Sequence, residues 1–253
     1  MKPWQTAVRY GAIIVAVILI INIASWGLKL FGVVIGLTSS GNCDESKIYE
    51  FDADIDCLDI DISAASLVIR YEKCDKITVK SSLKSLTLKE SFGKLRINDN
   101  KGLFSVNETE SWIEIMLPDG TVLRDLDLDL GAGKTLVSSV SIRNADIDGG
   151  AGELLINRCI ISELDLDMGV GKLDFRGKIT DRADIDLGVG EADFIFIGNR
   201  DDYRLKLEKG IGSVSVEGEE FSHGEIGNGD VRVDVDGGIG KINVSFLSDS
   251  ETE

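Results

Sequence analysis

Apolar and polar residues alternate through most of the chain after residue 43, and this period of two is typical of β-strands with one buried face. The alternation is clearest in a 19-residue unit, where an Asp-x-Asp-x run leads into Gly-x-Gly at Gly131, Gly150, Gly169 and Gly188. A fixed period over several copies predicts units that bury their apolar sides by stacking on one another. We therefore predict an all-β fold, a stacked β-repeat of the β-solenoid or β-helix type, with the G-x-G repeats spanning residues 121–247.

Each unit is predicted to contain a strand, a glycine corner and a returning strand. Glycine suits a corner because the missing Cβ permits positive φ angles and a close approach of neighbouring backbones. The residue between the two glycines is aliphatic in every copy, and we expect it to continue the inward phase. The aspartates two and four residues before the corner alternate with Leu or Ile, so we expect them to point outward. They form a candidate cation-binding ladder: Asp127, Asp129, Asp146, Asp148, Asp165, Asp167, Asp184 and Asp186.

The triplet GKT at residues 133–135 is also the end of a phosphate-binding P-loop, G-x-x-x-x-G-K-[ST]. That motif requires a glycine at position 128, where this chain has Leu128, and a helix after the lysine, where this chain continues to alternate. We therefore expect no nucleotide partner. Instead, the column after the corner alternates in charge, and we expect an exposed ladder of surface ion pairs from Lys134, Glu153, Lys172 and Glu191.

Less regular segments flank the repeats. Residues 44–120 contain short alternating runs, which predict irregular N-terminal β-rungs or a cap, and the stretch CLDIDISAASLVIR at 57–70 has Ser63-Ala64-Ala65 where G-x-G would stand. Residues 248–253 read as an acidic tail. The one histidine, His223, is expected in an exposed loop between the last two corners.

The four cysteines lack the spacing of a metal site. Cys57 and Cys159 fall in apolar columns and are expected to be buried as small hydrophobic side chains. A disulfide between Cys43 and Cys74 is left open, since an exported domain would meet an oxidising environment.

The N-terminus is predicted to be anchored in a membrane. Residues 10–28 carry no charge and can cross the hydrocarbon core, so we assign 10–29 to a single-pass transmembrane helix. Lys2 and Arg9 precede it, which places residues 1–9 in the cytoplasm. The 30–43 juxtamembrane linker and the repeats then lie on the far side of the cell membrane. A cleaved signal peptide is the alternative for this segment.

The chain is acidic, with 27 Lys and Arg against 44 Asp and Glu, a net charge of −17. This balance disfavours nucleic acid and anionic lipid as partners of the repeats and favours cations or basic surfaces. No cofactor is predicted, and Ca²⁺ is the candidate ion. We expect Lys206, four residues before Gly210, to enter one aspartate column on the next rung and to offset part of the repulsion.

The chain resembles bacterial membrane-anchored β-strand-repeat proteins, adhesin-type proteins of unknown function that are also described as toastrack domains. The resemblance is carried by WIEIMLPDG at 112–120 leading into LDLDLGAGKTLV, and then by LDLDMGVGKLDF, ADIDLGVGEADF and VDVDGGIGKINV. It covers roughly residues 50–247 and implies a stacked β-repeat outside the membrane. In some members it also implies gene contexts linked to envelope stress, and it supplies no catalytic residues.

Three functional interpretations are compatible with this pattern. The first is a non-enzymatic surface protein that binds as an adhesin or envelope-interaction module, with a cell-envelope component or a membrane protein as partner. The second is a sensory or regulatory accessory of an envelope-stress response. The third, a polysaccharide-cleaving enzyme on stacked strands, is disfavoured because the aspartates repeat almost unchanged, whereas a catalytic site differs from its surroundings.

Overall fold

The computed structural model describes residues 46–83, 85–99 and 111–248. Nearly all of these residues are in β-strands, as the alternation predicts, and they belong to one compact unit, Cys43–Glu253. In the described part of the chain, no helix combines the length and the apolar character needed to cross a bilayer. The predicted membrane segment, residues 10–29, lies outside the described residues.

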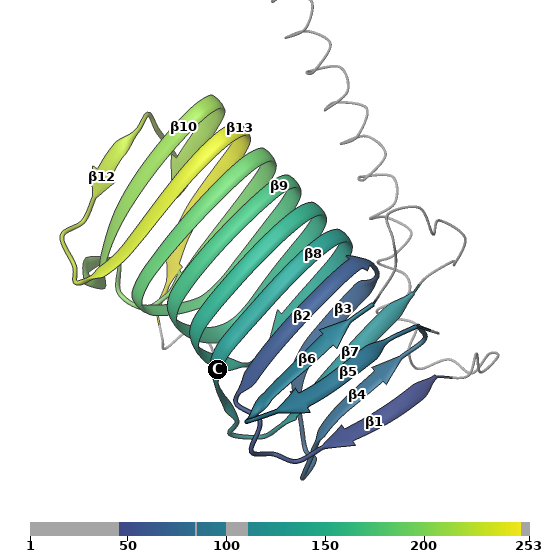
Figure 1. Cartoon of the computed structure of the whole chain (residues 1–253). Helices are drawn as coiled ribbons and strands as arrows, with labels where there is room; N and C mark the ends of the chain where they lie inside the picture. Colours follow the sequence, from purple (N-terminus) through teal and green to yellow (C-terminus); the bar gives the residue numbers. More distant parts are fainter. Residues whose placement is uncertain (1–45, 84, 100–110, 249–253) are drawn as a thin grey trace, which may run out of the picture. The chain divides into compact units, whose positions relative to one another are not determined.

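The centre of the unit is a stack of parallel rungs. The strand β8 (Val122–Ser138) contains one 19-residue unit, and the 57-residue strand β9 (Ser141–Ile197) winds through three more (Figure 1). The register is constant, since Asp127 pairs with Asp146 before the corner and Val137 pairs with Ile156 after it. Each rung therefore has two strand segments that enclose the core between them, and the stacked β-repeat prediction is confirmed.

The N-terminal end of the stack opens into two layers. β2 (Cys57–Ala64) pairs with the first segment of β8 and β3 (Ser66–Glu72) with the second, with Ala64 opposite Ala132, so the Ser-Ala-Ala stretch forms a corner in register. One layer continues through β6 (Lys94–Asn98) and β5 (Thr87–Ser91). The other continues through the remaining strands: β7 (Trp112–Pro118), β4 (Ile77–Ser81) and β1 (Lys47–Phe51).

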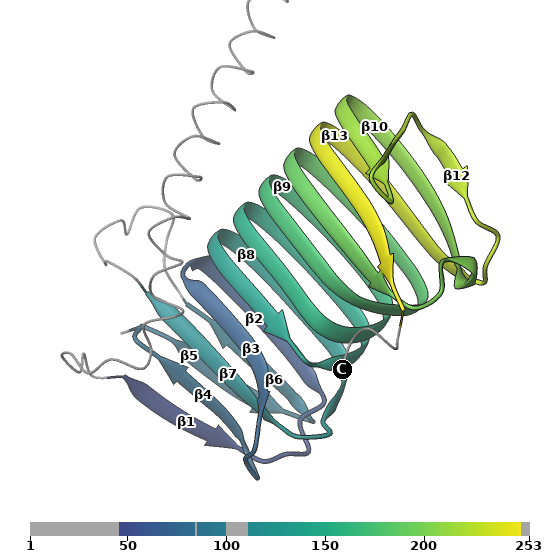
Figure 2. The same ribbon diagram turned by 180° about the vertical axis from the view of Figure 1, so that it is seen from behind.

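At the C-terminal end the order of the rungs departs from the order of the sequence. β13 (Val231–Leu247) lies between β9 and β10 (Tyr203–Val216) and is parallel to both (Figures 1 and 2). A short 3₁₀ turn, Arg200–Asp202, precedes β10. The outer edge of β10 pairs with two short antiparallel strands, β11 (Glu219–Phe221) and β12 (Gly224–Ile226). The last rung is therefore covered at both of its segments, which limits edge-to-edge pairing with other chains.

The glycine corners are required by the distance between rungs. Gly152 has a φ of +156°, and a Cβ built there would lie 1.9 Å from the carbonyl oxygen of Gly133 on the rung before it. Real Cβ atoms keep more than 3 Å from such an atom, so no side chain fits without a shift of the backbone. The prediction that close rung-to-rung approach selects these glycines is confirmed.

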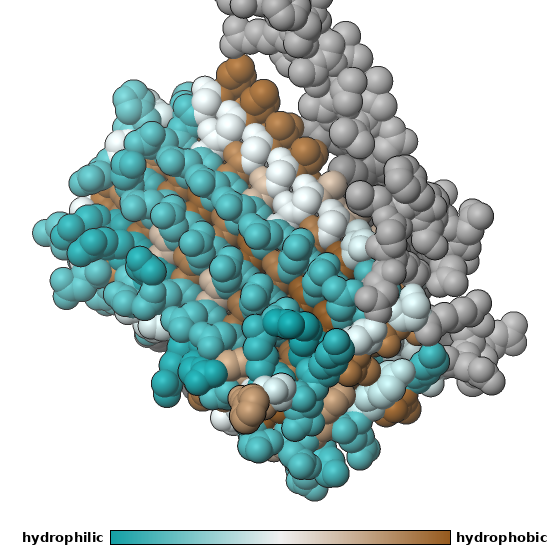
Figure 3. Space-filling view, viewed as in Figure 1, coloured by the Kyte–Doolittle hydropathy of each residue, from teal (hydrophilic) through white to brown (hydrophobic). Residues whose placement is uncertain are grey.

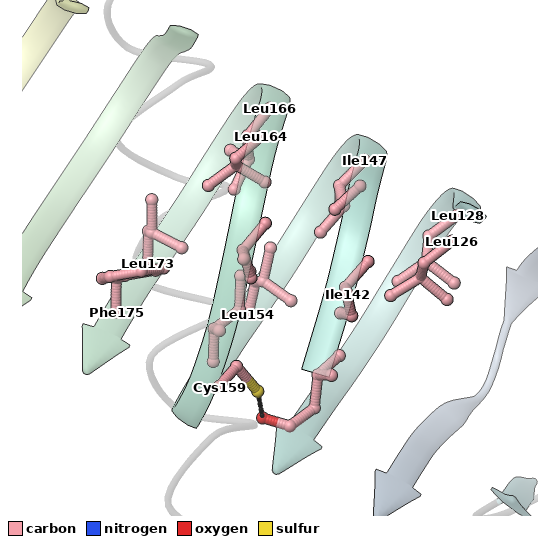
Figure 4. Packing of buried hydrophobic residues seen from close by; sticks show 14 of the residues in the cluster. Leu126, Leu128, Ile142, Ile147, Leu154, Cys159, Leu164, Leu166, Leu173 and Phe175 are labelled. Atoms are coloured by element: carbon pink, nitrogen blue, oxygen red, sulfur yellow. Dashed lines mark hydrogen bonds between the residues drawn. The ribbon is translucent and has the colours of Figure 1, made fainter. Parts of the chain in front are cut away.

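The core is a continuous column of aliphatic side chains that becomes aromatic toward β10. Residues from the first segments, such as Ile147 and Leu166, face residues from the second segments, such as Leu154 and Leu173 (Figure 4). Farther along, five rings lie within 6.3 Å of a neighbouring ring, centroid to centroid: Phe175, Phe194, Phe196, Tyr203 and Phe246.

Both cysteines predicted to be buried are buried. Cys57 and Cys159 are 3% and 1% exposed. The Cys159 thiol donates to the Val137 carbonyl oxygen at 3.5 Å, and burial raises its pKa to about 11, so it stays protonated and unreactive near neutral pH. Cys74 is a free cysteine, and Cys43 lies outside the described residues. His223 is exposed between β11 and β12, as expected.

Candidate binding surface

The eight candidate aspartates lie together on one outward surface, which we call the aspartate face. It is formed by the strand segments that precede the corners, and all eight side chains are exposed. Their partners in register are equivalent aspartates, for example Asp127 opposite Asp146 and Asp129 opposite Asp148. The set is longer than predicted, because equivalent positions on β2 and β13 also carry aspartate in register: Asp59, Asp61, Asp234 and Asp236.

The aspartate face therefore has two parallel columns. Column A consists of the residues four before the corner: Asp59, Asp127, Asp146, Asp165, Asp184, Asp234 and finally Lys206. Column B consists of the residues two before the corner: Asp61, Asp129, Asp148, Asp167, Asp186, Asp236 and finally Glu208. Neighbours in a column are one strand spacing apart, about 4.8 Å, where two unit charges repel by about 1 kcal/mol in water.

Column A ends in basic residues on both sides, whereas column B does not. At one end Asp59 accepts from Lys94 at 2.6 Å and from Arg96 at 2.8 Å. At the other end Lys206 enters column A, as expected, but its neighbour in register is Asp234 of β13 and not Asp184. The order of the sequence predicts that Lys206 follows Asp184 directly. This is wrong by one rung, because β13 lies between β9 and β10. Column B ends in Asn98 and Glu208 and thus has no basic residue in register.

The repulsion within the columns is visible in the pKa values of several carboxyl groups. Burial and the neighbouring Asp165 and Asp127 raise the pKa of Asp146, and burial together with Asp167 and Asp236 raises that of Asp186. Asp59 shows the opposite net effect. Burial by itself raises its pKa, but the hydrogen bonds from Lys94 and Arg96 bring it below the ordinary value. The surroundings of Asp146 and Asp186 therefore favour protonation or a cationic partner.

A shallow groove of about 630 Å³ runs across the rungs beside column B. One wall consists of carboxylates of column B, from Asp129 to Asp236, and the other consists of the first glycines of the corners. The floor between them is mostly apolar, with Leu130, Met168 and Leu187. The groove thus offers an acidic edge, an apolar base and an edge without side chains, repeated on successive rungs.

The aliphatic residues between the two glycines point outward, which corrects the expectation that they continue the inward phase. Ile211 is 59% exposed and Ile239 is 41% exposed. The two-residue alternation holds along a straight strand, but at a corner the chain turns and the middle residue lies at its convex apex. With Ala64 of the equivalent Ser-Ala-Ala corner, these residues form one row in register, which we call the ridge: Ala64, Ala132, Ala151, Val170, Val189, Ile239 and Ile211. Figure 3 shows a row of neutral residues with a hydrophobic row beside it crossing the rungs at one margin of the molecule.

The column after the corner is a charge ladder only in part. Lys134 pairs with Glu153 at 3.0 Å, and Lys241 of β13 lies 3.7 Å from Glu191. Lys172 instead pairs with Asp174 on its own strand at 3.0 Å. Lys134 is also buried, at 9% exposure, whereas its place in the repeat predicts a surface position.

The side-chain geometry does not form a compact metal centre. Across residues 46–83, 85–99 and 111–248, no three His, Cys, Asp or Glu side chains are grouped so that they would hold a metal ion. The aspartates are spread along the stack and do not converge on one point. The Ca²⁺ expectation stays a prediction, and it concerns a repeated acidic surface and not a chelating cage.

No protein-family model and no curated protein matches the chain. Several solved structures resemble it. A "putative cell adhesion protein" from Clostridium sporogenes is 16% identical, with a TM-score of 0.41, over 80% of this chain and 99% of that one. A "putative adhesin" from Bacteroides fragilis is 10% identical, with a TM-score of 0.43, over 80% of this chain and 98% of that one. A "putative lipid binding protein" from Parabacteroides distasonis is 14% identical, with a TM-score of 0.30, over 79% of this chain and 96% of that one.

Proposed function

We propose that this protein is a non-enzymatic binding module that holds a basic partner at the cell surface through its aspartate face. The observation that carries the proposal is the in-register repetition of column B beside an apolar-floored groove. The rungs along the groove each place one column B aspartate at the same spacing, so the surface suits an elongated partner that makes the same charged contact several times. Electrostatic attraction would steer such a partner and set its orientation.

In this proposal residues 10–29 anchor the module in the cell membrane, with residues 1–9 in the cytoplasm and the β-stack outside. The support is the uncharged span and the basic residues before it. Protease added to intact cells is expected to remove the C-terminal region. Complete protection of the folded protein would contradict this topology.

The binding test compares two variants of equal charge. Asp148→Asn/Asp167→Asn removes two carboxylates from column B, whereas Asp174→Asn/Asp193→Asn removes two from the opposite face of the rungs. Retention of the full chain on immobilised cell-envelope preparations is measured at fixed salt concentration. The proposal expects a loss for the first variant only. Equal losses of retention for the two variants would mean that binding depends only on net charge. Undiminished retention of the first variant would refute the role of the aspartate face.

A further inference from the structure

The ridge is an exposed apolar feature that the fold does not require. The flanking glycines are required by the carbonyl groups of a neighbouring rung, whereas the apex residue points outward at the corner. A polar β-branched residue such as Thr would serve equally well there. Instead, each of the seven rungs carries Ala, Val or Ile, and these side chains, exposed at Ile211 and Ile239 and half-buried at Val170 and Val189, form one row in register. Scattered surface hydrophobics are normal, but a contiguous row marks an interaction site.

The ridge runs parallel to column B, with the groove between them. Asp148 and Ala151 are three positions apart in the chain, so at most about 10 Å separates column B from the ridge across the corner. The surface is therefore a strip with one acidic edge and one aliphatic edge. A second copy of this chain fits the strip poorly, because its own aspartate face would oppose that of the first. A partner segment with one basic edge and one apolar edge matches both edges.

The spacing of the rungs distinguishes between helical and extended partners. Neighbouring rungs are about 4.8 Å apart, and one turn of an α-helix rises about 5.4 Å. Side chains on one edge of an extended strand repeat every 6.8 Å or so. Over the four intervals from Asp129 to Asp236, a helix drifts out of register by about 2.4 Å and a strand by about 8 Å. An α-helix is about 10 Å wide, so it can reach both edges of the strip at once.

We propose that the strip between column B and the ridge docks a basic amphipathic helix of a partner protein. The helix lies along the stack, with Lys or Arg side chains toward column B and aliphatic side chains against the ridge. About 13 residues span the five rungs of the groove. This inference rests on the proposed function and adds the chemistry and secondary structure of the partner.

The test uses the full chain in nanodiscs of zwitterionic lipid, with empty discs as the reference. The probe is a synthetic 16-residue helical peptide with a lysine stripe beside a leucine stripe, and a scrambled peptide of equal composition is the control probe. The ridge variant is Val170→Thr/Val189→Thr/Ile239→Thr, which keeps charge and β-propensity. Its matched control changes three exposed hydrophobic residues off the ridge: Ile48→Thr/Val122→Thr/Ile160→Thr.

The amphipathic peptide is expected to bind the unmodified chain more tightly than the scrambled peptide. Each apolar carbon group removed from a buried contact weakens binding about fourfold, so the three ridge substitutions together are expected to raise Kd at least about tenfold. The control triple variant is expected to leave Kd unchanged. Unchanged melting of the ridge variant shows that the loss is not unfolding.

The possible failures are distinguishable. If Asp148→Asn/Asp167→Asn weakens peptide binding but the ridge variant does not, the acidic binding surface stands and the helix-docking inference is overturned. If neither weakens it, the proposed function fails as well. Equal affinity for the amphipathic and scrambled peptides, or a dimer that the ridge variant dissolves in sedimentation, would also overturn the inference.

Discussion

The glycine corners allow a test in which two substitutions three residues apart should act in opposite directions. At Gly152 a methyl group would lie 1.9 Å from the Gly133 carbonyl oxygen, and the φ of +156° disfavours any L residue. At Gly149, on the same rung, φ is not positive, and the nearest atom to an added Cβ is the Asp167 carbonyl oxygen at 3.5 Å, an ordinary contact. Gly149 also faces the groove floor, where a methyl group has room.

We expect Gly152→Ala to cost about 3 kcal/mol or more, since overpacking costs about 1 to 3 kcal/mol and an unfavourable φ a similar amount. For a chain of this size that corresponds to a fall in Tm of about 6 to 12 °C. Gly149→Ala is expected to be neutral or to stabilise by about 0.4 to 1 kcal/mol, because alanine has fewer unfolded conformations to lose. Urea and thermal denaturation of the purified full-length chain measure both. Similar losses at the two sites would show that the corner is not held by close rung-to-rung contact.

Four further outcomes are expected from the described residues. Because the pKa of Asp146 is raised in the folded state, its carboxyl group takes up a proton before it does so in the unfolded chain, so its contribution to stability should rise as pH falls from neutral toward the ordinary value of 3.8. Asp146→Asn should flatten that dependence of the urea midpoint, and a steeper one would contradict the sign. Millimolar Ca²⁺ should raise Tm, and Asp148→Asn/Asp167→Asn should reduce the rise; equal shifts with NaCl at matched ionic strength would reduce the effect to screening. Phe196→Ala should cost about 3 to 5 kcal/mol in urea titrations, because the ring is fully buried among other rings, and a cost below about 1 kcal/mol would count against the aromatic core. Lys134→Ala should leave ATP binding unchanged, since that lysine pairs with a glutamate of the next rung; saturable binding lost in the variant would contradict the repeat interpretation.

The regular part of the fold is predictable because local chemistry repeats there. The alternation arises because one face of each strand is buried, and the glycine corners arise because neighbouring rungs approach closely. Both features recur every 19 residues and are visible in the sequence. The signal for Asp59, Asp61, Asp234 and Asp236 is also present, in the same Asp-x-Asp pattern of LDIDI and VDVDG. These four aspartates fall outside the predicted set because that set contains only the four units of equal period.

Other features depend on information that a local pattern does not contain. The outward direction of Ile211 and Ile239 arises at a turn, where strand alternation no longer describes the chain. The position of β13 was not predictable either, because β10 and β13 carry the same alternation and either one would match β9 in register. The choice between them is made by tertiary packing. The burial of Lys134 likewise depends on its neighbours in space.

The position of β13 between β9 and β10 affects the order in which the rungs fold and the effect of C-terminal truncation. β10 leaves the ribosome before β13, and with its matching corner it can pair with the free edge of β9 in a register that the finished molecule does not use. If that pairing forms, β10 has to separate from β9 before β13 can insert between them. Such a non-local rearrangement slows folding. For the same reason, a deletion that begins at Val231 removes an interior layer and not the end of the stack. Such a deletion leaves β10 without the strand that it pairs with. The free energy of unfolding should therefore fall in one large step as the chain is shortened from its C-terminus.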